Sequence, residues 1–223
     1  MSKTREQIIE EQVRKWERMR SEEREKKPYT PIVTVCREPG SGGRIVAKRI
    51  AEQLGLEFFD REIIQEMAEN THVTLRLLET LDEKGLTVLE DWIATLVFKR
   101  HLWPNQYLKS LMKVISTIGR HGRAVILGRG ANFILCPECP DVSFRVRIVA
   151  PLEMRVQNVA HDFHIKAEEA KRRVLRTESN RRAFVRKYFH ANITDPYNYD
   201  LVINIENLSI DAATEAIKGA LGR

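Results

Sequence analysis

The sequence has few cysteines and no long apolar run, and these two absences exclude several classes of protein. Only three of its 223 residues are cysteine, an odd and small number that favours a reducing compartment over a disulfide framework. No stretch approaches the roughly 20 apolar residues that a membrane helix needs. The first residues, Met-Ser-Lys-Thr-Arg-Glu, lack the apolar core of a secretory signal. We therefore expect a cytoplasmic protein that has no membrane partner.

The positive charge is concentrated in one part of the chain. The net charge is +6, and residues 145–190 contain 12 Lys and Arg against 5 Asp and Glu. Such a run is either a solvated helix face or a surface that meets phosphate. Because no DNA-reading motif and no aromatic-rich platform accompany it, we do not expect nucleic acid as a partner.

Short β-branched segments alternate with helical patterns, which predicts an α/β fold with a five-stranded, mostly parallel sheet. The segments lack polar alternation, as is typical of strands buried on both faces. The predicted strands are 32–36, 57–59, 124–127, 142–149 and 201–204. The predicted helices include 4–26, 46–54, 71–122 with breaks near Gly85 and Pro104, 166–189, and a last helix capped by Ser209.

The first predicted helix is charged and amphipathic, and we assign residues 1–28 to an extension that precedes a domain spanning 29–223. An apolar stripe of Ile9, Val13, Trp16 and Met19 recurs at helical spacing. This stripe can pack on the core, on another partner or on a second copy of the chain, so a homo-oligomer formed through it is one expectation.

A glycine-rich loop, Arg37-Glu-Pro-Gly-Ser-Gly-Gly-Arg44, lies between the first strand and the next helix. Glycines allow positive φ, so that successive N–H groups can point into one concavity, and the helix adds its positive dipole end. This arrangement predicts an anion site for the phosphates of a nucleotide.

Two nucleotide motifs compete for this loop, and neither matches fully. The dinucleotide pattern G-x-G-x-x-G begins with Gly40 and Gly42, but Ile45 occupies the third glycine position. The P-loop pattern G-x-x-x-x-G-K-[ST] has Gly43 at the lysine position and Arg44 at the hydroxyl position. The motifs alone leave the choice open.

A longer run, from Val33 to Ile64, closely resembles the start of the bacterial cytidylate kinase-like family. Its loop, its following helix and its Phe-Phe-Asp-Arg-Glu-Ile-Ile segment all match. Further similar blocks are Gly128-Arg129, 150–155, 180–184 and 199–204. The resemblance implies a three-layer P-loop NTPase fold of the nucleoside monophosphate kinase type. It also implies a helical insertion at about 71–122 and an arginine-rich lid at about 166–189.

The resemblance further implies an ATP- and Mg²⁺-dependent kinase that phosphorylates a small acceptor, such as the nucleoside monophosphate CMP. Since the P-loop lysine is absent, the alternative is a degenerate kinase that acts as a non-catalytic, nucleotide-binding regulator. True cytidylate kinases have Gly-Arg-Asp where this chain has Gly130 after Arg129, which weakens the case for cytosine as the base.

The candidate site residues follow from the loop, the resemblance and the basic run. For nucleotide binding they are Arg37, Gly40, Ser41, Gly42, Gly43, Arg44 and Ile45. The candidate catalytic residues are Arg44, Asp60, Arg176, Arg181 and Arg182. Asp60 and Arg129 are expected to bind the acceptor, and Asp60 can also cap a helix or hold Mg²⁺ through water. No direct metal ligand is assigned, because Cys136 and Cys139 form a C-x-x-C that has no second pair.

Overall fold

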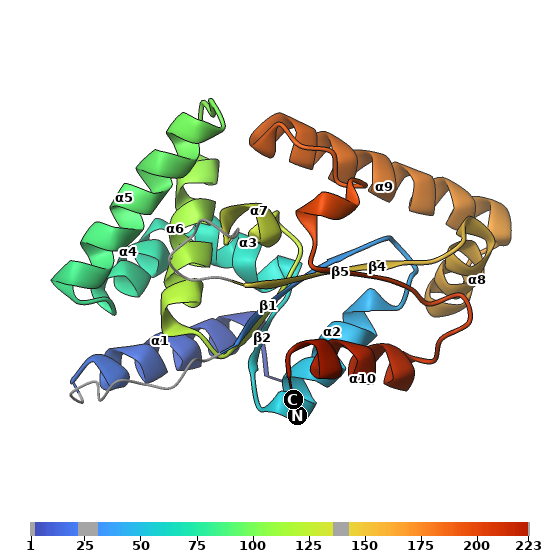
Figure 1. Cartoon of the computed structure of the whole chain (residues 1–223), viewed down its shortest axis with the longest axis horizontal. Helices are drawn as coiled ribbons and strands as arrows, with labels where there is room; N and C mark the ends of the chain where they lie inside the picture. The colour runs from blue at the N-terminus through green and yellow to red at the C-terminus, as the bar shows by residue number, and fades with distance from the viewer. Residues whose placement is uncertain (1–2, 22–30, 136–142, 223) are drawn as a thin grey trace.

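A computed structural model describes residues 3–21, 31–135 and 143–222 (Figure 1). Its centre is a five-stranded sheet in the order β2-β3-β1-β4-β5. The strands are β1 (Ile32–Arg37), β2 (Glu57–Phe59), β3 (Ala124–Leu127), β4 (Phe144–Val149) and β5 (Leu201–Asn204). Every strand pairing is parallel, which confirms the predicted sheet.

Two hydrophobic clusters cover the two faces of the sheet and produce three layers. On one face, α2 (Gly43–Leu54) and α10 (Ile210–Ala220) pack through Val46, Ile50 and Ile217. On the other face lie α1 (Arg5–Ser21), α3 (Arg61–Glu69) and α6 (Gln106–His121). Strand residues alternate between the clusters, so both faces of β1 and β3 are buried, as the absence of polar alternation predicted.

The apolar stripe of α1 packs on the core of the same chain. Ile9, Val13 and Trp16 are buried, and the Trp16 ring stacks on His121 with a centroid separation of 4.3 Å. The predicted helix extends to residue 26, but residues 22–26 lie outside the described part of the chain. Because these three side chains are already covered, a homo-oligomer through this stripe would have to displace them from the core.

Four helices form the region between β2 and β3, and the last three of them span the residues of the predicted helical insertion. They are α3, α4 (Thr71–Glu79), α5 (Glu83–Lys99) and α6. The break expected near Gly85 falls at residues 80–82, and Gly85 lies inside the first turn of α5. The Asp82 side chain caps that turn by accepting from the Gly85 N–H at 2.8 Å. The break around Pro104 is confirmed, since α5 ends at Lys99 and α6 begins at Gln106.

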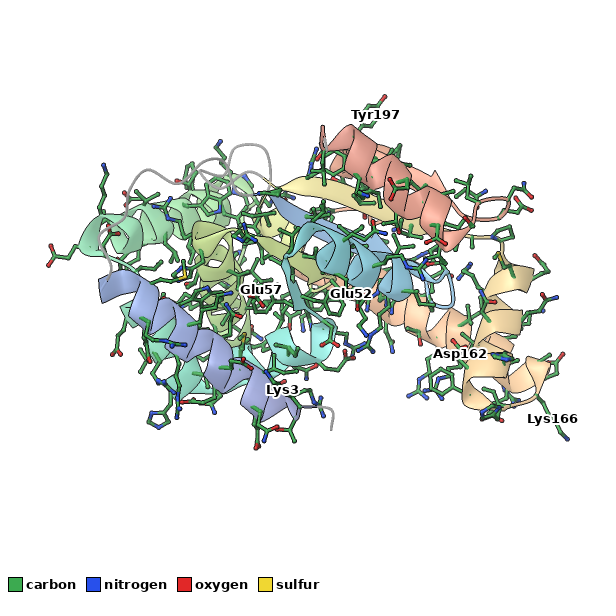
Figure 2. All side chains as sticks on the ribbon, turned by 90° about the horizontal axis from the view of Figure 1, so that it is seen from below. Lys3, Glu52, Glu57, Asp162, Lys166 and Tyr197 are labelled. Carbon is green, nitrogen blue, oxygen red and sulfur yellow. The ribbon has the colours of Figure 1, made fainter. Side chains whose placement is uncertain are left out.

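A helical hairpin projects from the end of the sheet where β4 finishes. It consists of α8 (Leu152–Phe163) and α9 (Ala167–Phe189), and Asp162 and Lys166 mark its exposed tip (Figure 2). Pro151 is the N-cap of α8 rather than a residue of its first turn. The short helices α7 (Ala131–Ile134) and η1 (Pro196–Asn198) complete the fold. No described helix is both long and apolar enough to span a bilayer.

Candidate active site

The glycine-rich loop runs from the end of β1 to the start of α2 in a conformation that only glycine fits. Gly40 has a φ of 77°, and a Cβ there would lie 2.3 Å from the carbonyl oxygen of Arg155. Gly42 has a φ of 70° and is the N-cap of α2, with no side-chain cap. Within the described residues, the N–H groups of Gly43 and Arg44 have no backbone acceptor. The loop therefore presents free amides at a helix N-terminus, which suit an anion.

The side chains of Ser41 and Ile45 contribute less to this anion site than the backbone does. Ser41 is fully buried, and its hydroxyl donates to the carbonyl oxygen of Glu38 at 2.9 Å. Ile45 is exposed, at 56% of its surface, on the first turn of α2. Ser41 thus fixes the shape of the loop. Because the N–H groups of Ser41 and Ile45 already donate to the carbonyl oxygens of Glu38 and Gly42, the amides open to an anion are those of Gly43 and Arg44.

Arg44 lies across the end of the loop and pairs with Asp60. The guanidinium Nη2 is 2.6 Å from Asp60 Oδ2, while the Arg44 side chain remains 64% exposed. The other carboxylate oxygen of Asp60 accepts from the N–H groups of Glu62 and Ile63 at 3.1 Å. Asp60 is therefore the N-cap of α3, as predicted, and it also holds Arg44 beside the loop.

A cavity of about 250 Å³ lies next to the loop, between the ends of β1 and β3 and helices α7 and α9. Among the described residues, its lining contains four arginines and no carboxylate. These are Arg37, Arg61, Arg129 and Arg181, accompanied by Cys36, Gly128, Gly130, Asn132, Phe133, Thr177, Asn180, Phe184, Val185 and Ile193. Such a concentration of uncompensated guanidinium groups is suited to an anionic ligand.

Arg37 is the most strongly perturbed of these arginines. Burial lowers its pKa from 12.5 to about 9, which means that the surroundings disfavour its charge. Its Nη1 would be 2.4 Å from a Cβ on Gly128, so the glycine makes room for it. Among the described residues its guanidinium forms no ion pair, and the charge of Glu62 acts on it only from a distance. At neutral pH, Arg37 is therefore a charged group that no described carboxylate contacts directly.

Arg129 and Arg181 reach the same cavity from β3 and α9. Burial lowers the pKa of both. Arg129 donates to Gln65 and lies 5.8 Å from the ring centroid of Phe184, while its buried Nε has no partner in the described structure. Arg181 donates from Nη1 to the carbonyl oxygen of Arg37 at 2.8 Å. The structure therefore brings together Arg37, Arg129 and Arg181 from the predicted set.

The other predicted lid arginines are placed differently. Arg176 is exposed on α9 and does not line the cavity, whereas Arg182 is paired with Glu178. Arg61 lines the cavity but was missed by the sequence reasoning. The sequence could have indicated Arg61, because this residue directly follows Asp60 at the carboxyl end of β2, where ligands bind in parallel sheets.

The Gly130 position has no room for a larger residue in this structure. Gly130 has a φ of 70°, and a Cβ there would lie 2.2 Å from Phe189 Cε2. Phe189 is fully buried and stacks on Phe133 with a centroid separation of 5.2 Å. An aspartate at position 130 would require this aromatic pair to move.

A larger groove of about 910 Å³ lies between α4, α5 and α6, and none of its described lining residues belongs to the glycine-rich loop. Its described lining has many apolar side chains, such as Leu78, Val97 and Phe98, and two lysines, Lys109 and Lys113. It lacks the clustered arginines of the smaller cavity among the described residues. Among the described residues, no group of three or more His, Cys, Asp or Glu side chains is arranged to hold a metal ion.

Comparisons with known proteins agree with this geometry. The family profile described as the Cytidylate kinase-like family matches residues 32–207. A cytidylate kinase of Methanopyrus kandleri is 27% identical over 198 residues, covering 85% of this chain and 92% of the relative. A cytidylate kinase of Ignicoccus hospitalis is 28% identical over 191 residues, covering 85% and 98%. Both relatives are archaeal, so they support the family but not the expected restriction to bacteria.

The fold is also found in a solved structure. An uncharacterized protein from Eubacterium ventriosum superposes with a TM-score of 0.64 at 20% identity, covering 86% of this chain and 98% of that one. At this identity the likeness establishes the fold alone. The family profile, by contrast, covers most of the chain and includes both the glycine-rich loop and the arginine cavity. The chain therefore belongs to the cytidylate kinase-like family.

Proposed function

We propose that this protein transfers the γ-phosphoryl group of ATP to a small acceptor that carries an anionic group, with a nucleoside monophosphate such as CMP as the first candidate. The observation that carries the proposal is the pairing of two adjacent anion sites. One is the set of free amides at the start of α2, and the other is the arginine cavity, with Arg37 unpaired inside it. A kinase needs one site for ATP and one for its acceptor, and Arg37, the last residue of β1, lies where the strand enters the loop.

The proposed roles follow from where each group lies. The amides of Gly43 and Arg44 bind phosphate oxygens of ATP, and the Arg44 guanidinium reaches the same anion from the start of α2. Arg37 and Arg129 bind the anionic group of the acceptor. Arg181, on α9, adds positive charge between the two sites. Phosphoryl transfer depends mainly on positioning and on neutralising the charge of the transferred group, which guanidinium groups provide.

Mg²⁺ would enter with ATP and supply charge neutralisation at the phosphates. Asp60 is the carboxylate beside the loop, but Arg44 and the first turn of α3 already occupy its two oxygens. Asp60 would therefore accept hydrogen bonds from water molecules bound to the metal, or exchange its pairing with Arg44 when the nucleotide binds. It would not be the main direct ligand of the metal. Mg²⁺ commonly binds through substrate phosphates with few protein carboxylates.

The name of the archaeal relatives favours CMP as the acceptor. Because the crowding at Gly130 leaves no room for an aspartate there, a different side chain would have to recognise the base. Asn132 and Asn180 line the cavity and offer amide donors and acceptors instead. A measurement of ADP release with ATP and Mg²⁺ tests the proposal across CMP, dCMP, UMP, AMP and small phosphorylated alcohols. We expect turnover with at least one phosphorylated acceptor and its loss in Arg129→Gln. The exposed Arg172→Gln is the matched control.

A second candidate function, a non-catalytic nucleotide-binding regulator, is favoured by one observation. Gly43 stands where P-loop kinases have lysine, and its Cβ position is filled by the Arg37 side chain, 2.6 Å away, so no lysine could replace it without rearrangement. Tight ATP binding with no turnover of any acceptor would support this regulator over the kinase. The absence of affinity for every nucleotide, with and without Mg²⁺, would eliminate both.

A further inference from the structure

We propose that Arg155 is a positioning residue that couples the glycine-rich loop to helix α9, so that nucleotide at the loop sets the position of the cavity arginines. This inference rests on the proposed function, because it assumes that a nucleotide binds the loop. It assigns a role to Glu38, Arg155 and Glu178, none of which is among the candidate site residues predicted from the sequence. The argument is built from one chain of buried ion pairs.

The chain begins at the loop itself. Glu38 directly follows β1, and its carboxylate accepts from Arg147 Nη2 at 3.3 Å and from the N–H of Ala150 at 3.2 Å. The same carboxylate lies 3.4 Å from Arg155 Nε. The Glu38 side chain is only 15% exposed, so its charge depends on these partners. The loop is therefore anchored to β4 and to the first turn of α8.

Arg155 continues the chain toward α9. It is 6% exposed, and its Nη1 donates to Glu178 Oε2 at 3.1 Å. Its own carbonyl oxygen touches Gly40, the glycine that admits no Cβ, and Asn158, one turn later, donates to the Gly40 carbonyl at 2.8 Å. The first turns of α8 thus contact the loop through both backbone and side chain.

Glu178 closes the connection on α9. Its carboxylate is shared between Arg155 and Arg182, and it lies one turn from Arg181, which donates to the carbonyl oxygen of Arg37. Two bridges therefore tie the middle of α9 to the loop, one through Arg155 and one through Arg181. By contrast, Asp162 and Lys166 at the tip of the hairpin are exposed (Figure 2).

The buried guanidinium of Arg155 has a defined geometry, because it pairs with both acids and its Nε also donates to the carbonyl oxygen of Ala150 at 2.9 Å. A shift of the loop on nucleotide binding would move Glu38 and would be transmitted through the planar guanidinium of Arg155 to Glu178. Such a linkage between two sites acts equally in both directions. The expected consequence is that ADP at the loop changes the stability of α9 at a distance from the ADP itself.

Hydrogen exchange measured by mass spectrometry on the full chain, with and without ADP, tests this coupling. In the wild type we expect ADP to slow exchange at the start of α2 and, by about fivefold or more, in α9 around residues 176–189. In Glu178→Gln we expect the protection at α2 to remain and the protection at α9 to fall severalfold, because only the Arg181 bridge to the loop is left. Glu169→Gln, an exposed acid on the same helix, is the matched control and should behave as the wild type.

Arg155→Met and Arg155→Lys extend the test. The methionine variant should uncouple α9 as Glu178→Gln does, and the lysine variant should restore part of the coupling because it keeps the charge. If Arg155→Met does not fold, Glu178→Gln decides the question alone. Protection of α9 that is as strong in Glu178→Gln as in the wild type would overturn the inference. Absence of ADP protection everywhere, even at α2, would instead overturn the proposed function.

Discussion

Replacing Arg37 with methionine should make the unliganded protein more stable and abolish its response to phosphate. Burial lowers the Arg37 pKa from 12.5 to about 9, which corresponds to roughly 5 kcal/mol of unfavourable interaction for the charged form. Methionine removes the charge but leaves part of the space empty, and the cavity term offsets some of the gain. We therefore expect the free energy of unfolding to rise by about 1–3 kcal/mol.

The stability difference is measured by thermal and urea unfolding of the unliganded proteins. The response to inorganic phosphate is measured in the same way in excess ADP, so that the glycine-rich loop is already filled. Phosphate at about ten times its dissociation constant should stabilise the wild type by about 1.4 kcal/mol and should leave Arg37→Met unchanged. In a chain of this size each kcal/mol moves the midpoint by roughly 2–4 °C. Arg172→Met, on the exposed face of α9, should show neither effect. A less stable Arg37→Met that still responds to phosphate would refute the reasoning.

Three other substitutions test the remaining parts of the site. Gly40→Ala should weaken ADP binding at least tenfold by calorimetry and lower the unfolding midpoint, because its Cβ would meet the Arg155 carbonyl oxygen at 2.3 Å. The helical Gly219→Ala is the control: its Cβ meets nothing within 4 Å, and it should stabilise the protein by about 0.5–1 kcal/mol. Equal effects of the two substitutions would contradict the account. Asp60→Asn should fold normally, since asparagine also caps helices. It should lower kcat by about tenfold or more, because the ion pair with Arg44 is lost. An unchanged kcat in steady-state assays would show that Asp60 does not belong to the site. Arg181→Lys should lower kcat/KM for the acceptor by about tenfold, whereas Arg176→Lys should leave it unchanged. A loss of kcat/KM in Arg176→Lys but not in Arg181→Lys would mean that α9 turns a different face to the cavity.

Local sequence chemistry was sufficient to predict most elements of the fold. The β-branched runs located all five strands, and Gly55 and Ser209 end and begin helices as their types suggest. The glycine-rich loop was also predictable, because its anion-binding character arises from backbone geometry over a few residues. Gly85 misled the prediction, since a glycine in the first turn of a helix is tolerated when Asp82 caps that turn.

The arrangement of the site was less predictable because it depends on distant pairings and on helix phase. Arg176 and Arg181 are five residues apart, which on an α-helix turns their side chains about 140° from each other. Only the packing of α9 decides that Arg181 faces the cavity. Likewise, Glu38 and Arg155 pair across more than a hundred residues, and no short motif marks such a contact.

Direct titration of ATP into the protein by calorimetry, in the presence of Mg²⁺, tests the central claim most directly. The account predicts saturable binding of one ATP per chain, weakened about tenfold in Arg44→Gln, which removes a charged donor to the phosphates, and unchanged in Gly219→Ala. Failure of the wild type to bind ATP, ADP or any other nucleotide would contradict the assignment of the loop as a phosphate site.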